Sequence, residues 1–169
     1  KVVATTTAVM MLVEEGRIRL RDPVSRYVSG FERYGKDDVR IEHLLTHVSG
    51  LRPDFPLEDE FDGADVAITR LVDERLLAAP GQRFVYSDLN FIALGEVVAR
   101  VSGMRLDEFA ITWISRPMGM NENSVTPRPS RRARIAPTER CRLLGWPCGS
   151  PEAPMRRGVV HDPKARRMG

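Results

Sequence analysis

The sequence predicts a globular domain in which helices predominate, and three observations support that prediction. The chain has 169 residues, of which 42% are hydrophobic, which is enough to bury a core. Apolar residues recur at helical spacing in residues 2–15, 67–77 and 91–101. Gly16 and Gly103 stand at or just past the ends of two of these stretches, where helices commonly stop.

Each expected element has its own signal. In chain order the elements are a helix at 2–15, an edge strand at 17–21, a helical turn at 22–27, an extended piece and a helix within 39–46, a loop at 53–65, a helix at 67–77, a strand at 84–86, a helix at 91–101 and a helix at about 106–115. Arginine alternating with apolar residues is typical of an exposed edge strand. Asp22-Pro23 offers an N-cap and then proline at the first helical position. Gly50 closes the helix that follows.

The middle of the chain is organised by its turns. Six acidic residues, two prolines and one glycine between positions 53 and 65 predict a surface loop. The Pro-Gly pair at 80–81 predicts a turn before the short strand. Ser87 or Asp88 can cap the next helix, since both side chains accept hydrogen bonds from free helix amides.

The helical pattern stops after Thr126. Seven of the twelve prolines fall in the last 43 residues. Residues 1–126 are therefore predicted as the helical part of one domain, and residues 127–169 as a Pro/Arg-rich loop segment of the same domain.

The charge is unevenly distributed. Positions 128–167 hold 11 Lys and Arg against three Asp and Glu, whereas the whole chain carries only +3. Aromatic residues do not interleave with this basic run, so we expect a solvated loop and no nucleic-acid partner. No apolar run approaches the roughly 18 residues of a membrane span, so no transmembrane segment is predicted.

The cysteines and histidines do not predict a metal site. Cys141 and Cys148 match neither a zinc nor a thioredoxin signature, and their spacing leaves both a disulfide and two free thiols open. His43 and His47 have zinc-compatible i, i+4 spacing, but no Glu follows His43 and a structural role is the better interpretation. For His161 the sequence suggests a position near a substrate cleft and assigns no role.

Lys1 is the first candidate catalytic residue. It heads the apolar helix at 2–15, where burial and the positive end of the helix dipole would both lower its pKa and let it accept a proton at neutral pH. The alternative is an ordinary first residue, because a single lysine carries little motif information.

Tyr86-Ser87-Asp88 is the second candidate site. It places a phenol at a strand-to-helix junction, where acyl-transfer enzymes keep catalytic groups. The alternatives are a packed tyrosine at a strand end and Asp88 as a plain helix cap. Ser49 lacks the Gly-x-Ser-x-Gly elbow of an α/β-hydrolase and is not predicted as a nucleophile.

Several segments together resemble the serine β-lactamase and penicillin-binding-protein superfamily, in its class C-like and esterase-like branch. They are the lysine-headed helix at 1–16, Leu-Leu-Thr-His-x-Ser-Gly-Leu at 44–51, Pro-Gly-x-x-Phe-x-Tyr-Ser-Asp at 80–88, and less specific matches at 135–139 and 158–163. The resemblance implies an α+β, β-lactamase/transpeptidase-like fold, in which a helical region packs against an antiparallel sheet built from both chain ends. These residues supply mostly the helical region, with the sheet largely missing.

The resemblance also implies a function. In this family a serine three residues before the lysine, in a Ser-x-x-Lys motif, forms an acyl-enzyme with an ester, a β-lactam or a D-Ala-type amide, and no cofactor takes part. Lys1 would be the general base and Tyr86 the proton relay. Asp88, which would contact the small-molecule or peptidoglycan-type substrate, stands where the family has asparagine, and this departure puts recognition of a substrate amide in question.

The resemblance sets further expectations. The serine is expected upstream of Lys1, and the third motif, Lys-Thr-Gly or His-x-Gly, downstream of Gly169. These 169 residues alone are therefore expected to be inactive, and the family's larger members suggest a periplasmic or extracellular location. The alternative function is a catalytically dead binding or scaffold protein.

Overall fold

The computed structural model describes residues 1–56, 61–139, 155–160 and 162–168. Its elements, in chain order, are the π-turn η1 (Val2–Thr6), α1 (Thr7–Glu14), the short 3₁₀ helices η2 (Val24–Arg26) and η3 (Arg33–Gly35), α2 (Ile41–Leu45), α3 (Ala64–Asp73), α4 (Asp88–Ser102), α5 (Leu106–Phe109), the π-helical η4 (Ala110–Ser115), the 3₁₀ helix η5 (Pro129–Arg134), β1 (Pro137–Glu139), β2 (Arg156–Arg157) and α6 (Pro163–Met168). Nearly all the regular secondary structure of the described residues is helical, as the sequence predicts.

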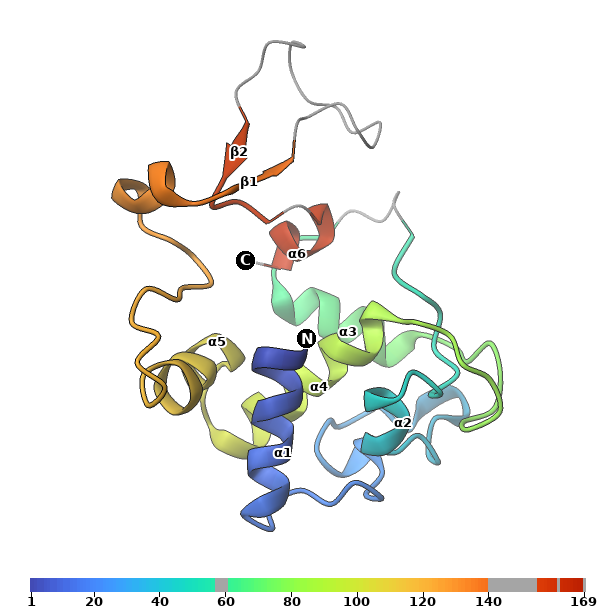
Figure 1. Ribbon diagram of the computed structural model, residues 1–169. Coiled ribbons are helices and arrows are strands. Elements are labelled where there is room, and N and C mark those ends of the chain that lie inside the picture. Colours follow the sequence, from blue (N-terminus) through green and yellow to red (C-terminus); the bar gives the residue numbers. More distant parts are fainter. Residues whose placement is uncertain (57–60, 140–154, 161, 169) are drawn as a thin grey trace.

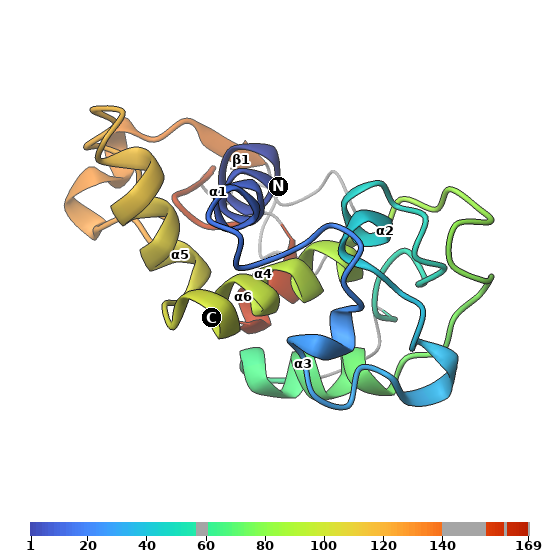
Figure 2. The ribbon, with the colours of Figure 1, turned by 90° about the horizontal axis from the view of Figure 1, so that it is seen from below.

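Helix α4 lies at the centre of the molecule. It contacts α1, α2, α3 and α5, and both views show it running between α1 and α3 (Figures 1 and 2). Apolar residues on several of its sides pack into the core, which fits a helix with neighbours all around. Its buried residues are Leu89, Asn90, Ala93, Leu94, Val97 and Val98. Asn90 is the polar exception, and it belongs to the site described below.

The predicted helix at 2–15 is confirmed, but it starts as a π-turn. The amide of Thr6 donates to the Lys1 carbonyl at 2.9 Å, which sets Lys1 on the first turn. Ala8, Val9 and Leu12 are fully buried. Val2 belongs to the apolar pattern that predicts this helix, yet it is 74% exposed.

Both predicted strands in the first hundred residues are wrong. At 17–21, the amides of Arg17 and Ile18 both donate to the Leu12 carbonyl, so the chain turns and buries Ile18 instead of extending. At 84–86 the chain is extended but pairs with no strand; Val85 makes one backbone hydrogen bond, to His47 at 2.9 Å. Short alternating patterns depend on a partner strand, and neither segment has one among the described residues.

The remaining helices are confirmed with shifted ends. The turn at 22–27 forms as η2, the helix within 39–46 as α2, and the stretch at 106–115 as α5 followed by η4. α3 starts earlier and ends earlier than predicted, at Asp73, while α4 starts at Asp88 rather than at 91. Gly103 ends α4 in the left-handed conformation, with φ +74°.

Two predicted loops contain more structure than expected. In the acidic loop, Phe55 and Phe61 are buried against each other with ring centroids 5.6 Å apart. In 127–169, β1 and β2 pair antiparallel, and α6 packs on α3. Figure 1 shows this strand pair beyond the helical body. Cys141, Cys148 and His161 lie outside the described residues.

Of the helices in the described residues, none is both long and apolar enough to cross a lipid bilayer.

A buried lysine closes the end of α3. The side chain of Lys36 is completely inaccessible, and its Nζ donates to the carbonyls of Arg33, Val72 and Glu74 at 2.9, 2.8 and 2.6 Å. Burial lowers the pKa of Lys36. The last carbonyls of a helix have no partner within the helix, so this ammonium stabilises the C-terminal end of α3.

We expect Lys36→Met to lower the free energy of unfolding by about 1–3 kcal/mol, because three buried carbonyls lose a charged donor. The loss is limited because the variant no longer buries a charge. Urea unfolding measures this change. Arg33→Met is the matched control: Arg33 pairs with Asp73 at the same helix end but at the surface, where an ion pair contributes about 0–1 kcal/mol. Equal losses in the two variants would contradict the role of Lys36.

Candidate active site

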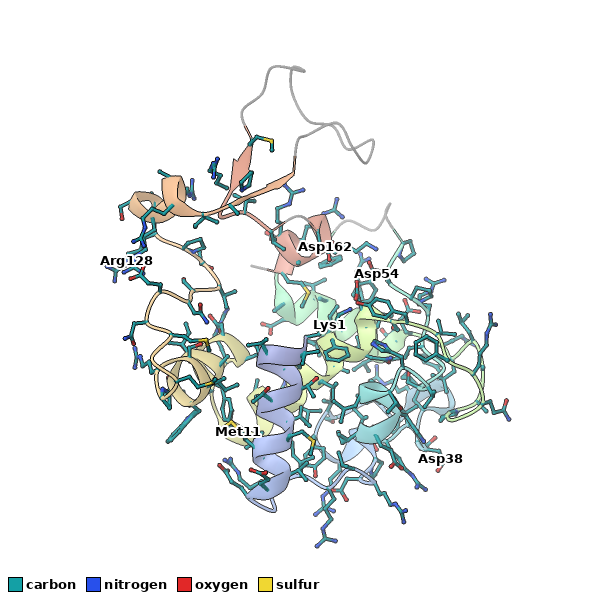
Figure 3. All side chains as sticks on the ribbon, in the orientation of Figure 1. Lys1, Met11, Asp38, Asp54, Arg128 and Asp162 are labelled. Carbon is teal, nitrogen blue, oxygen red and sulfur yellow. The ribbon has the colours of Figure 1, made fainter. Side chains whose placement is uncertain are left out.

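The fold brings together the three residues that the sequence nominated. The Lys1 ammonium donates hydrogen bonds to the Tyr86 hydroxyl and to the Asp88 carboxylate. Its Nζ also lies 4.0 Å from the centroid of the Tyr86 ring. Figure 3 shows Lys1 at the start of the first helix, in the middle of the molecule. Lys1 and Asp88, which are 87 positions apart in the sequence, therefore belong to one cluster with Tyr86.

The cluster is open to solvent on one side. Tyr86 is 57% exposed, and the side chains of Lys1 and Asp88 are 30% and 39% exposed. Tyr86 precedes α4 by two residues, and Asp88 is the first residue of α4. A carboxylate at this position is stabilised by the free amides and the positive dipole of the helix start. All three side chains are therefore partly accessible to solvent.

His47 lies against the tyrosine. Its ring centroid is 4.6 Å from that of Tyr86, with 31° between the ring planes, and 5.3 Å from that of Phe91. His47 follows α2 and has a left-handed backbone, with φ +58°. Sequence reasoning gave this histidine a structural role only, and no sequence signal revealed its contact with Tyr86.

A chain of buried polar groups supports His47. The Ser87 amide and the Asn90 side-chain amide both lie 3.1 Å from its Nδ1. The Ser49 hydroxyl donates to Asn90 Oδ1 at 2.6 Å, and it accepts from the Leu51 amide at 3.1 Å. Ser49 and Asn90 are almost completely buried. Ser49 is thus a packing residue, as expected, and not an exposed nucleophile.

Ser87, one of the two residues predicted to cap the next helix, directly precedes α4. Its side chain, however, does not cap the helix: the hydroxyl donates to the Arg52 carbonyl at 2.6 Å. The next amide, that of Asp88, donates to the Pro53 carbonyl at 2.7 Å. The segment at 52–53 therefore holds the start of α4 in place.

Gly50 allows a close backbone approach next to the site. Its φ is +85°, and a Cβ there would lie 2.0 Å from the Ala78 carbonyl oxygen. The Gly50 carbonyl accepts from the Leu77 amide at 2.7 Å, and the Val48 carbonyl accepts from the Gly81 amide at 2.8 Å. No side chain fits in this position.

The charge state of Lys1 differs from the expectation. Burial by itself would lower the pKa of Lys1, but the hydrogen bonds to Asp88 and Tyr86 outweigh it, and the pKa of Lys1 is raised. The predicted lowered pKa is therefore wrong for this arrangement, because the sequence did not show that Asp88 pairs with Lys1. Burial and the nearby charge of Lys1 lower the pKa of His47, so its imidazole is neutral at pH 7.

The two histidines of the i, i+4 pair do different things. His43 Nδ1 accepts from the Arg40 amide at 3.2 Å, at the start of α2, whereas His47 Nδ1 accepts from the Ser87 amide and the His47 ring packs on Tyr86. Within the described residues, no group of three His, Cys, Asp or Glu side chains could hold a metal ion.

Comparison with known proteins gives consistent relatives. Residues 1–156 match the protein family described as Beta-lactamase. A putative D-alanyl-D-alanine carboxypeptidase of Salmonella schwarzengrund is 31% identical over 98% of this chain, which spans 39% of that protein. This chain thus spans about two fifths of the length of that curated relative.

Two solved structures illustrate the structural similarity of this chain to known proteins. The octameric penicillin-binding protein homologue from Pyrococcus abyssi has a TM-score of 0.62 and 32% identity, over 69% of this chain and 29% of that one. A hydrolase with promiscuous acyltransferase activity, EstCE1, has a TM-score of 0.59 and 30% identity, over 68% of this chain and 35% of that one.

The pairing of Lys1 with Asp88 predicts a measurable change. Asp88→Asn should lower the pKa of Lys1, because it removes a negative charge and a carboxylate acceptor. A ¹⁵N NMR titration of Lys1 Nζ measures this. Asp107→Asn is the control, since Asp107 pairs with Arg105 on the surface and should leave Lys1 unchanged. An unchanged titration in Asp88→Asn would show that the carboxylate does not control Lys1.

Proposed function

Because this chain belongs to the β-lactamase family, we propose that the protein containing it is a serine hydrolase that forms an acyl-enzyme. Its substrate is an ester, a β-lactam or a D-Ala-type amide. The observation that carries the proposal is the hydrogen bonding of one ammonium, Lys1, to both Tyr86 and Asp88. These three side chains can exchange protons at the start of the first helix.

The nucleophile in this proposal is a serine three residues before Lys1 in the whole protein. That spacing places its hydroxyl one helical turn back on the same face as the lysine. The serine oxygen bonds to the substrate carbonyl carbon, and its proton passes to Lys1. Tyr86 delivers its hydroxyl proton to the departing alcohol or amine as the old bond breaks, and Lys1 passes the proton taken from the serine to Tyr86. Water then attacks the acyl-enzyme and releases the acid.

Asp88 shifts the pH range in which the first step takes place. Lys1 accepts the serine proton only when its own amine is neutral, and its pairing with Asp88 and Tyr86 favours the ammonium. The neutral fraction of Lys1 therefore grows as pH rises toward its raised pKa. Acylation should follow that fraction, with its ascending limb displaced to higher pH by Asp88.

Asp88 also bears on the substrate. An ionised carboxylate only accepts hydrogen bonds, whereas asparagine can also donate to a substrate amide carbonyl. A β-lactam or a peptide presents such a carbonyl beside the scissile bond, and a simple ester does not. We therefore expect the protein to prefer small esters over β-lactams.

Labelling of the whole protein with a serine-reactive phosphonate tests the proposal. We expect stoichiometric labelling at the serine three residues before Lys1, with turnover of activated esters, and no labelling of residues 1–169 expressed alone. A different residue at that position, with no labelling, would favour a catalytically inactive binding protein. Labelling at Ser49 or Ser87 would show that this serine is the nucleophile instead.

Tyr86→Phe in the whole protein should reduce kcat by about 10²- to 10⁴-fold with a much smaller effect on KM, because it removes only the proton-relay hydroxyl. Steady-state ester hydrolysis measures this. Tyr34→Phe is the control, since Tyr34 is comparably exposed, at 52%, and packs against Arg75 away from the site. A kcat within about threefold of the parent would return Tyr86 to a packing role.

Asp88→Asn should shift the ratio of kcat/KM between amide-bearing substrates and simple esters toward the amides, by about 1–3 kcal/mol if one buried hydrogen bond is gained. Parallel assays with a β-lactam and a small ester give the ratio. If Asp88→Asn leaves it unchanged while Asp88→Ala lowers only Tm, the residue is a helix-start carboxylate without a role in selectivity.

A further inference from the structure

We propose that His47 is a positioning residue that holds Tyr86 in its place beside Lys1, and that it does so only as a neutral imidazole. The proposal rests on the proposed function, in which Tyr86 relays the proton. His47 would not touch the substrate; it would act through the tyrosine.

Three contacts from one residue surround Tyr86. The His47 carbonyl accepts from the amide of Val85, the residue before the tyrosine, at 2.9 Å. His47 Nδ1 accepts from the amide of Ser87, the residue after it, at 3.1 Å. The imidazole ring packs on the phenol ring, 4.6 Å between centroids. The backbone on both sides of Tyr86 and the ring itself thus depend on His47.

The hydrogen-bond directions determine which nitrogen carries the proton. The Ser87 backbone amide can only donate, so His47 Nδ1 must be the unprotonated nitrogen. Asn90 agrees with this, because the Ser49 hydroxyl donates to its Oδ1 and its NH₂ group therefore faces Nδ1. A second proton on His47 would set an N–H against both donors and release the contact with Ser87.

Three groups that can carry charge or titrate face His47 from the elements around it. They are Lys1 at the start of the first helix, Asp88 at the start of α4, and Tyr86 itself. Burial and Lys1 disfavour the imidazolium, whereas Asp88 favours it, and the resulting pKa is lowered. The contacts of His47 around Tyr86, which we call the tyrosine clamp, are therefore intact at pH 7. They are lost as pH falls through the lowered pKa of His47.

The left-handed backbone of His47, with φ +58°, allows a matched pair of variants. Asparagine and glycine both tolerate this conformation. His47→Asn also keeps a carbonyl oxygen as far along the side chain as Nδ1, so it can still accept from Ser87, but it does not titrate. His47→Gly removes the acceptor and the ring together without adding backbone strain.

The experiment measures ester hydrolysis by the whole protein between pH 5 and 8 for the parent and both variants. At pH 7.5 we expect His47→Gly to lose about 10- to 100-fold in kcat with little change in KM, as for a misplaced catalytic group, and His47→Asn to retain most of kcat. The ratio of kcat in His47→Asn to kcat in the parent should rise as pH falls below 6.5. This ratio cancels the pH dependence of Lys1, which both proteins share.

A second readout follows Tyr86 directly. In whole protein labelled with 3-fluorotyrosine, the ¹⁹F resonance that Tyr86→Phe removes should move between pH 7.5 and pH 5 in the parent and stay constant in His47→Asn. A parent that neither hydrolyses esters nor reacts with the phosphonate refutes the proposed function, while this resonance still tests the clamp. An active parent with unchanged kcat in His47→Gly, or a Tyr86 resonance indifferent to His47, refutes the role of His47 alone.

Discussion

The candidate site depends on the close backbone approach of residues 47–50 to residues 77–87. Hydrogen bonds from Leu77 to Gly50, from Gly81 to Val48 and from Val85 to His47 join the two segments along their length. A side chain on Gly50 would collide with the Ala78 carbonyl, so the approach requires glycine. Tyr86 has no sheet partner among the described residues, so this contact holds the segment that carries it.

The electrostatics of the site follow from one ion pair. Lys1 donates to two acceptors, the hydroxyl of Tyr86 and the carboxylate of Asp88, and it forms an ion pair with Asp88. An asparagine there would leave Lys1 less strongly held as an ammonium, since a neutral amide attracts a cation less than a carboxylate does. The same ammonium acts on His47 and disfavours its protonation. Asp88 thus raises the pKa of Lys1 through their hydrogen bond, and at His47 it acts against Lys1, since its charge favours the imidazolium that Lys1 disfavours.

Support for the site extends to the far end of the described chain. Lys164 of α6 is almost buried and pairs with Asp54 at 2.6 Å. Asp54 follows Pro53, whose carbonyl accepts from the amide of Asp88. α6 therefore braces the segment that holds the start of α4. This ion pair gives residues expected to be a solvated loop a structural connection to the cluster of Lys1, Tyr86 and Asp88.

The sequence by itself determined the main helices and nominated the three candidate site residues, because helical periodicity and glycine stops are local signals, and the lysine-headed helix and the Tyr-Ser-Asp segment resemble local motifs of the family. It did not determine that residues 17–21 turn back, since that outcome depends on the Leu12 carbonyl and on the burial of Ile18. The tertiary structure alone decided that Asp88 pairs with Lys1 and that His47 lies on Tyr86. Both facts depend on contacts between residues far apart in the chain, and such contacts set the charges that local sequence patterns leave open.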